Sequence, residues 1–102
     1  MSLGLEVLGT NVRAGRLEID VIARAGEVIA IVEVRTRGAG AWEKALDSIG
    51  WKKRRRIRHA GERLWRTRFS KQPGVERMRF DCASVTFDAD DSATVEYVTA
   101  AF

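Results

Sequence analysis

The sequence has little cysteine, proline and histidine. Among its 102 residues are one cysteine (Cys82), one proline (Pro73) and one histidine (His59). A lone cysteine excludes an internal disulfide and a multi-cysteine zinc site, so we interpret Cys82 as a small buried hydrophobic residue. A single histidine gives little support to a multi-histidine metal site. No apolar run approaches the roughly 20 residues that cross a bilayer, and the first residues lack a signal-peptide pattern, so we expect a cytoplasmic protein without a membrane partner.

Basic residues, in contrast, are concentrated in one segment. Residues 52–68 hold nine of the 18 Lys and Arg residues but one of the 14 acidic residues, Glu62. Such a block commonly contacts a polyanion, and a solvated surface face is the alternative. We expect nucleic acid to bind through Arg37, Lys52, Arg55, Arg56, Arg63 and Arg66.

The hydrophobic pattern predicts five strands and one long helix. Runs of β-prone residues between turn signals predict strands over residues 5–12, 16–24, 27–35, 77–87 and 94–99. Apolar residues at helical spacing predict a helix that begins near residues 48–50 and ends near Phe69. We expect one domain over residues 1–102, of the α/β class, with the basic helix packed across a mixed sheet.

The second and third predicted strands carry an acidic cluster. With Ala25-Gly26 as a two-residue turn, Glu18 lies directly opposite Glu33, and Asp20 lies diagonal to Glu33. Side-chain alternation places these carboxylates on one face of the hairpin and leaves the other face wholly apolar. We expect the apolar face to form the core.

Carboxylates that face each other on a sheet repel, so this cluster requires an explanation. Solvation, partial protonation or a bound cation would each relieve the repulsion. Oxygen ligands without nearby cysteine or histidine suit Mg²⁺ or Mn²⁺ rather than zinc. The alternative is that the acids line the solvent face of an ordinary hairpin, with Arg16 and Arg35 as ion-pair partners. The residue pattern leaves both interpretations open.

Several motifs resemble one protein family. Residues 18–24 read EIDVIAR and residues 31–37 read IVEVRTR. These strings resemble the YraN-like family of uncharacterised predicted endonucleases, whose members typically read GEIDLIA followed by VEVKTR. The resemblance continues in KRRRI at residues 53–57, similar to the family's KQRRL, in RFD at residues 79–81 and in the terminal AF at residues 101–102. It covers most of the chain.

That family is similar to Holliday-junction resolvases and restriction enzymes of the PD-(D/E)xK type. The resemblance therefore implies a restriction-endonuclease-like (tRNA-endonuclease-like) fold and metal-dependent hydrolysis of phosphodiester bonds, with structured DNA favoured as the substrate. It implies that Asp20 and Glu33 are catalytic ligands of Mg²⁺ or Mn²⁺. It further implies that the carbonyl of Val34 is another ligand, that Glu18 is an additional or indirect one, and that position 35 is the catalytic lysine. In such sites the metal polarises the phosphate and lowers the pKa of the attacking water, and a cation stabilises the developing charge.

Two features depart from the family pattern. Position 35 is Arg35, which can bind a phosphate or stabilise an oxyanion but does not exchange a proton near neutral pH. The family usually carries a glutamate-bearing helix before its first strand, and this chain begins almost at that strand. We therefore expect that helix to be missing, either because the protein is short or because Met1-Ser2-Leu3 replaces removed sequence.

Lys53 is the candidate that replaces the missing lysine. It lies on the apolar stripe of the predicted helix, because Ile49 and Ile57 lie four residues before and after it. We hypothesise that Lys53 reaches the carboxylates and acts as a catalytic residue. The alternative is that its stem packs while its ammonium group reaches water.

A few further residues have two interpretations. Trp42, Trp51 and Trp65 either stack on unpaired bases or pack in the core, and we expect Trp65 to pack. Asp81 alternates with apolar neighbours, so we interpret it as a structural hydrogen-bonding residue.

Two other functions are alternatives to metal-dependent cleavage. A nuclease-derived module that binds nucleic acid without turnover is the main one, and a basic domain that binds RNA or a protein is another. A homodimer stays open by analogy with related nucleases.

Overall fold

The computed structural model describes residues 4–37 and 50–102. Its elements are β1 (Glu6–Ala14), β2 (Leu17–Ala25), β3 (Val28–Arg37), α1 (Trp51–Thr67), the short 3₁₀ helix η2 (Phe69–Lys71), β4 (Arg77–Phe87) and β5 (Ala93–Val98). The expected strands and helix are found within a few residues of their expected bounds, and η2 was not expected. No helix in these two ranges is both long and apolar enough to cross a membrane.

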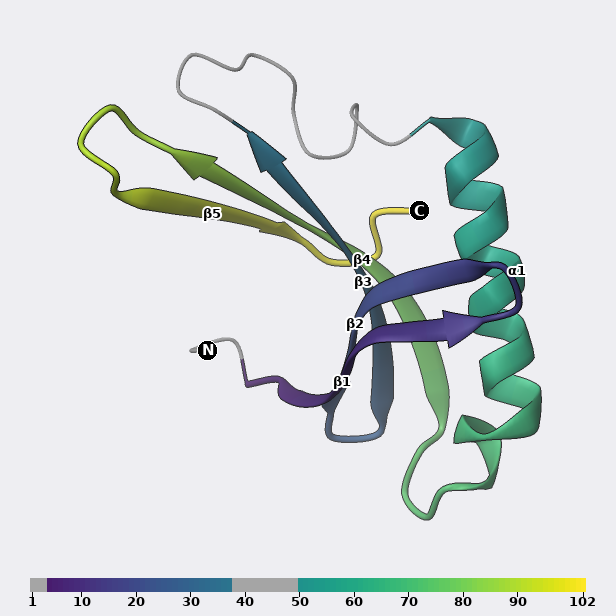
Figure 1. Ribbon diagram of the computed structural model, residues 1–102. Coiled ribbons are helices and arrows are strands. Elements are labelled where there is room, and N and C mark those ends of the chain that lie inside the picture. The colour runs from purple at the N-terminus through teal and green to yellow at the C-terminus, as the bar shows by residue number, and fades with distance from the viewer. Residues whose placement is uncertain (1–3, 38–49) are drawn as a thin grey trace.

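The strands form one mixed sheet in the order β1-β2-β3-β4-β5. The β3/β4 pair is parallel and the other three pairs are antiparallel. A parallel pair requires a crossover connection, and α1 belongs to that crossover. Figure 1 shows α1 packed across one face of the twisted sheet, beside the β1–β2 hairpin. The α/β class with a helix across a mixed sheet is therefore confirmed.

The main core lies between α1 and the sheet. A methyl group on Gly61 of α1 would lie 2.7 Å from the ring of Phe80 in β4 and 3.5 Å from Ile31 in β3, so the helix approaches the sheet closely at this point. The buried residues of this cluster are Ile19, Ile22, Ile29, Ile31, Ile57, Ala60, Leu64, Phe69, Val75 and Phe80. Ala23, Ala30 and Val32 form a second cluster, together with partly buried residues that include Tyr97.

The face expected to form the core is buried and makes up the second cluster, but the main core under α1 lies on the opposite face. Since Ile31 lies under α1, alternation places Glu33 on that same helix-covered face of β3, whereas Ala30 and Val32 lie on the other face. Both faces of this hairpin are apolar enough to be buried, so the alternation pattern could not say which one the helix covers.

The expected register of the β2–β3 hairpin is wrong. Ala25 pairs with Val28, so the turn residues are Gly26 and Glu27 rather than Ala25 and Gly26. Gly26 has φ 60°, and the first position of a tight hairpin turn needs such a positive φ, which glycine adopts without strain. The shift places Asp20, rather than Glu18, opposite Glu33. Ile19, expected on the face of Val21 and Val32, packs in the main core.

Asp81 of β4 forms hydrogen bonds with residues near the C-terminus. Its fully buried carboxylate accepts hydrogen bonds from Arg79 Nε (2.8 Å) and Nη2 (3.0 Å), from the Tyr97 hydroxyl (2.6 Å) and from the Ala100 amide (2.9 Å). Four donors compensate the desolvation of one buried charge, as such a group requires. The structural interpretation of Asp81 is confirmed, and Cys82 is buried beside it as expected.

Candidate active site

Asp20 and Glu33 lie where the β2–β3 pairing ends. The paired Cα positions run from Ala25–Val28 to Val21–Val32, so the next step of this register sets Asp20 opposite Glu33. Beyond this point a side chain rather than the backbone bonds to β3: Asp20 Oδ2 accepts a hydrogen bond from the Val34 amide at 2.9 Å. The strand therefore holds the Asp20 carboxylate beside β3.

Two cations lie against Glu33. The Nζ atom of Lys53, in the first turn of α1, is 2.7 Å from Glu33 Oε1, and Arg35 Nε is 3.7 Å from the same oxygen. The side chain of Glu33 is 5% exposed, that of Arg35 29% and that of Lys53 41%. The carboxylate is thus covered by protein, while both cations reach from it toward solvent.

The charge state of Glu33 follows from this environment. Its burial raises the pKa of Glu33 above the ordinary value, because a carboxylate loses hydration there. The hydrogen bond and positive charge of Lys53 lower the pKa again, whereas the neighbouring Asp20 carboxyl raises it. With the net pKa raised, Glu33 is a carboxylate that further positive charge would stabilise in its ionised form.

Arg35 brings an unused hydrogen-bond donor to the site. Its Nε atom is buried and has no hydrogen-bond partner among the described residues. A buried guanidinium donor without an acceptor is unfavourable unless another group supplies the oxygen. Arg35 is therefore able to donate a hydrogen bond to a phosphate or water oxygen without giving up an existing one.

The donor set fits a hard divalent cation. Proteins bind Mg²⁺ through one or two carboxylates together with water and substrate phosphate oxygens. Asp20 and Glu33 supply two adjacent carboxylates of this kind. In residues 4–37 and 50–102, no third acidic, histidine or cysteine side chain completes a metal-binding group with them.

Glu18 does not join the pair. It is exposed, and the β2–β3 register sets Asp20, not Glu18, opposite Glu33. The expectation that three carboxylates share one cluster is therefore wrong, and the register shift is the reason. The solvent-face alternative is wrong as well for Glu33, because α1 covers it. The carbonyl of Val34 as a further ligand stays a prediction; the contact that Val34 makes with the site is through its amide.

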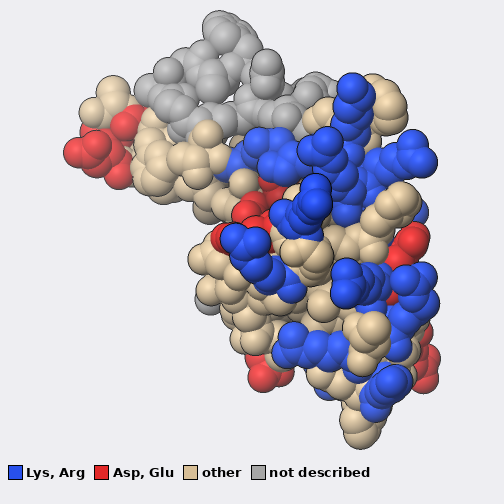
Figure 2. Space-filling view, turned by 45° about the vertical axis from the view of Figure 1, so that its right-hand side comes forward, with Lys and Arg blue, Asp and Glu red and all other residues tan. Residues whose placement is uncertain are grey.

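The expected nucleic-acid contacts lie on α1. Lys52, Arg55, Arg56, Arg63 and Arg66 are all exposed. Figure 2 shows Lys and Arg side chains spread over this face of the molecule, with acidic atoms visible between them. Arg37 ends β3, and its side chain lies outside the described part of the chain.

The tryptophans divide between surface and core. Trp65 is partly buried and packs against the main core, as expected. Trp51 is 67% exposed, and the ammonium group of Lys52 lies 5.7 Å from the centroid of its ring. Trp42 lies outside the described residues.

The sequence did not single out Arg16 as a binding residue. Arg16 was considered as an ion-pair partner of the hairpin carboxylates, but it lies in the β1–β2 turn and lines a pocket beside α1. The only sequence signal was its place after Gly15, in a segment with turn propensity. Its nearness to α1 depends on a contact between elements far apart in the sequence.

Comparison with known proteins identifies the family. The chain belongs to the uncharacterised protein family UPF0102, which it matches over residues 1–85. It is 65% identical over 99 residues to a UPF0102 protein of Sorangium cellulosum (strain So ce56), covering 97% of this chain and 69% of that protein. A UPF0102 protein of Streptomyces coelicolor is 36% identical over 95 residues, covering 92% and 72%, and one of Acidothermus cellulolyticus is 31% identical over 110 residues, covering 99% and 82%. UPF0102 is the YraN family, so the resemblance drawn from the motifs is confirmed.

Proposed function

We propose that this protein is a metal-dependent nuclease that hydrolyses phosphodiester bonds in DNA, on a restriction-endonuclease-like fold. The observation that carries the proposal is the burial of Glu33 between Asp20 and two cations, with Lys53 Nζ at 2.7 Å. An ordinary structural ion pair needs one carboxylate and one cation. Here a second carboxylate and a second cation adjoin the pair, and one of the cations has an unused donor.

In this proposal each residue has a separate task. Asp20 and Glu33 hold Mg²⁺ or Mn²⁺, which when bound polarises a phosphate oxygen and lowers the pKa of an attacking water. Arg35 donates a hydrogen bond to the phosphate through the Nε atom that lacks a partner. Lys53 supplies an amine, and an amine exchanges protons where a guanidinium does not.

The charges at the start of α1 support the binding part of the proposal. The first turn of this helix has no acidic residue, and Gly50 provides no side-chain cap. Lys52 and Lys53 instead place positive charge at the positive end of the helix dipole, which is unfavourable for the isolated helix. A phosphate bound at this end would reverse that penalty, because helix N-termini attract anions.

The test is cleavage of labelled DNA and RNA, including branched, duplex and single-stranded substrates, with Mg²⁺ or Mn²⁺ and with EDTA. The Asp20→Asn, Glu33→Gln and Lys53→Gln variants are expected to lose cleavage by at least about 100-fold, since each removes a ligand or a charged group from the site. Glu96→Gln on exposed β5 and Lys71→Gln on η2 are the matched controls and should cleave like the wild type.

Two results would overturn the proposal. Cleavage that survives in Asp20→Asn and Glu33→Gln would place the reaction elsewhere. Salt-dependent binding of nucleic acid without cleavage by the wild type would instead favour the alternative, a nuclease-fold module that binds without turnover.

A further inference from the structure

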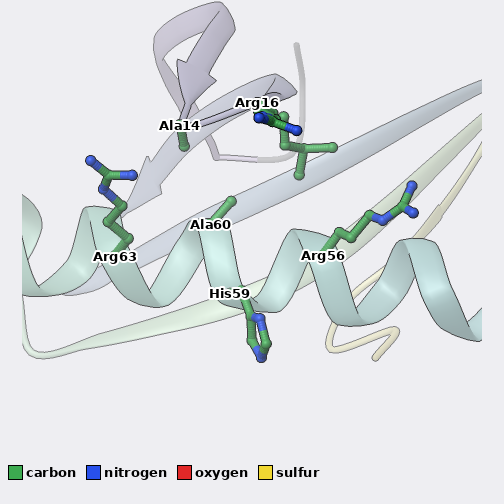
Figure 3. A pocket seen from close by; sticks show the side chains of 7 residues that line it. Ala14, Arg16, Arg56, His59, Ala60 and Arg63 are labelled. Atoms are coloured by element: carbon green, nitrogen blue, oxygen red, sulfur yellow. The ribbon is translucent and has the colours of Figure 1, made fainter.

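An open pocket of about 550 Å³ lies between α1 and the turn of the β1–β2 hairpin. Its floor consists of small or apolar side chains, Ala14 and Leu17 from the hairpin and Ala60 from the helix. Figure 3 shows Ala60 pointing from α1 toward the hairpin, between Arg56 and Arg63. A larger side chain at position 60 would fill this space, so the alanine keeps the pocket open.

Three arginines surround this floor. Arg56 and Arg63 come from α1, seven residues and two helical turns apart, and Arg16 comes from the hairpin turn. The turn also positions one of them: Arg63 Nη1 lies 3.4 Å from the point that a methyl group on Gly15 would occupy. Gly15 has φ 67°, which glycine adopts without strain, so glycine permits the turn that brings the hairpin to Arg63.

These arginines have no acidic partner in the part of the chain that the structure describes. Among the described residues, no ion pair or side-chain hydrogen bond links Arg16, Arg56 or Arg63 to a carboxylate. His59 also lines the pocket but points away from the hairpin (Figure 3). A concave surface concentrates the field of such charges, and the planar guanidinium group matches the oxygens of a phosphate. The pocket is therefore complementary to an anion with several oxygens.

The pocket lies along the same helix as the candidate active site. Lys53, Arg56 and Arg63 follow one another on α1, and a rise of about 1.5 Å per residue separates Lys53 from Arg63 by about 15 Å along the helix axis. Along one strand of a DNA duplex, successive nucleotides are about 3.4 Å apart on the helix axis. The distance from Lys53 to Arg63 therefore corresponds to about four nucleotides. One strand could thus contact both places at once.

We propose that this pocket binds a backbone phosphate of the nucleic-acid strand whose scissile phosphate lies at Asp20 and Glu33. Arg16, Arg56 and Arg63 are its binding residues, and the bound phosphate lies within about four nucleotides of the cleavage point. The inference rests on the proposed nuclease function for the position of the strand. The existence of the phosphate site does not depend on turnover.

Binding is measured first, so that cleavage plays no part. A labelled DNA duplex is titrated in EDTA with wild type and with Arg16→Gln, Arg56→Gln and Arg63→Gln, by fluorescence anisotropy at several salt concentrations. Each pocket variant is expected to raise Kd by about tenfold and to lower the slope of log K against log salt by about 1. Arg77→Gln, which removes an equal charge from the start of β4, is the control and should change neither by a comparable amount.

A second experiment locates the phosphate. Single phosphates of the duplex are replaced one at a time by neutral methylphosphonates, and binding is compared between wild type and Arg63→Gln. At one or two positions, the neutral replacement should weaken binding by the wild type. At the same positions it should not weaken binding by Arg63→Gln any further, because that variant already lacks the contact. Thermal unfolding monitored by circular dichroism checks that the variants fold.

The outcomes separate the two proposals. Pocket variants that bind like Arg77→Gln would overturn the phosphate site even in an active nuclease. Weakened variants in a protein that never cleaves would keep the site and reject the proposed function. Tight binding of inorganic phosphate by wild type, lost in the pocket variants while DNA binding is kept, would overturn the backbone assignment in favour of a small-anion site.

Discussion

Lys53 Nζ lies 2.7 Å from Glu33 Oε1, and this contact joins the first turn of α1 to the centre of the sheet. It places an amine beside a carboxylate that is 5% exposed, at a site where the neighbouring position on β3 carries Arg35. A helix residue thereby supplies a cation to the carboxylate pair on the sheet. The pair also couples the charge state of the site to the position of the helix.

The first prediction concerns the pKa of Glu33. Lys53 lowers this pKa, so Lys53→Gln should raise it and shift the onset of Mn²⁺ binding to higher pH. The measurement is Mn²⁺ affinity as a function of pH by calorimetry, with Lys71→Gln as the control. An unchanged pH dependence in Lys53→Gln would show that the contact does not act on Glu33.

A second prediction concerns stability. Because the pKa of Glu33 is raised in the folded state, the folded protein holds this proton more tightly than the unfolded chain does. The ionised form therefore destabilises the fold at pH values above the raised pKa, and the penalty disappears as the pH falls toward the ordinary pKa of a glutamate. Glu33→Gln should unfold at higher urea concentration than wild type at neutral pH, and the difference should shrink on acidification. A difference that grows on acidification would contradict the assigned direction. Glu96→Gln provides the control.

The third prediction concerns the packing of α1 on the sheet. Gly61→Ala would place a methyl group 2.7 Å from the ring of Phe80, so the ring or the helix must move. We expect a net loss of about 1–3 kcal/mol in the free energy of unfolding, even though alanine favours the helix. The exposed neighbour Glu62→Ala should stay within about 0.5 kcal/mol of wild type. Denaturant unfolding measures both, and equal stability of the two variants would show that the close approach is not limiting.

The fourth prediction uses the single tyrosine of the chain. Burial, together with the hydrogen bond to the Asp81 carboxylate, raises the pKa of Tyr97 well above its ordinary value. Since the folded state holds the phenolic proton more tightly, the stability from this group is intact at neutral pH and is lost as the pH rises above about 10. Ultraviolet titration should show no tyrosinate near pH 10 in the folded protein. Ordinary titration of the folded protein would contradict the contact.

Tyr97→Phe tests the same contact without a change of pH. It removes one of four donors from a fully buried carboxylate and should lower the free energy of unfolding by about 1–3 kcal/mol. Thermal or urea unfolding at neutral pH is the measurement. An unchanged free energy of unfolding would show that the hydrogen bonds from Arg79 and Ala100 are sufficient for Asp81 without the tyrosine.

Much of the fold followed from local patterns. Alternating Ile and Val residues with glycine turns located the strands of the hairpins, because strand periodicity depends only on near neighbours. The helical stripe through Ile57 and Leu64 located α1 and gave Lys53 its inward position. Asp20 and Glu33 were identified as a pair from these patterns and from the family motifs.

The sequence by itself thus determined the elements, the family and the pair of carboxylates. Only the tertiary structure decided which carboxylate faces Glu33, because a positive φ at Gly26 moves the hairpin turn by one residue, and a turn sets the register of its strands. It also decided that α1 covers the face of β3 that carries Glu33, since both faces of this strand hold buried apolar residues. The pocket of Arg16, Arg56 and Arg63 likewise exists only after α1 has packed beside the first hairpin, and local periodicity carries no information about such a contact.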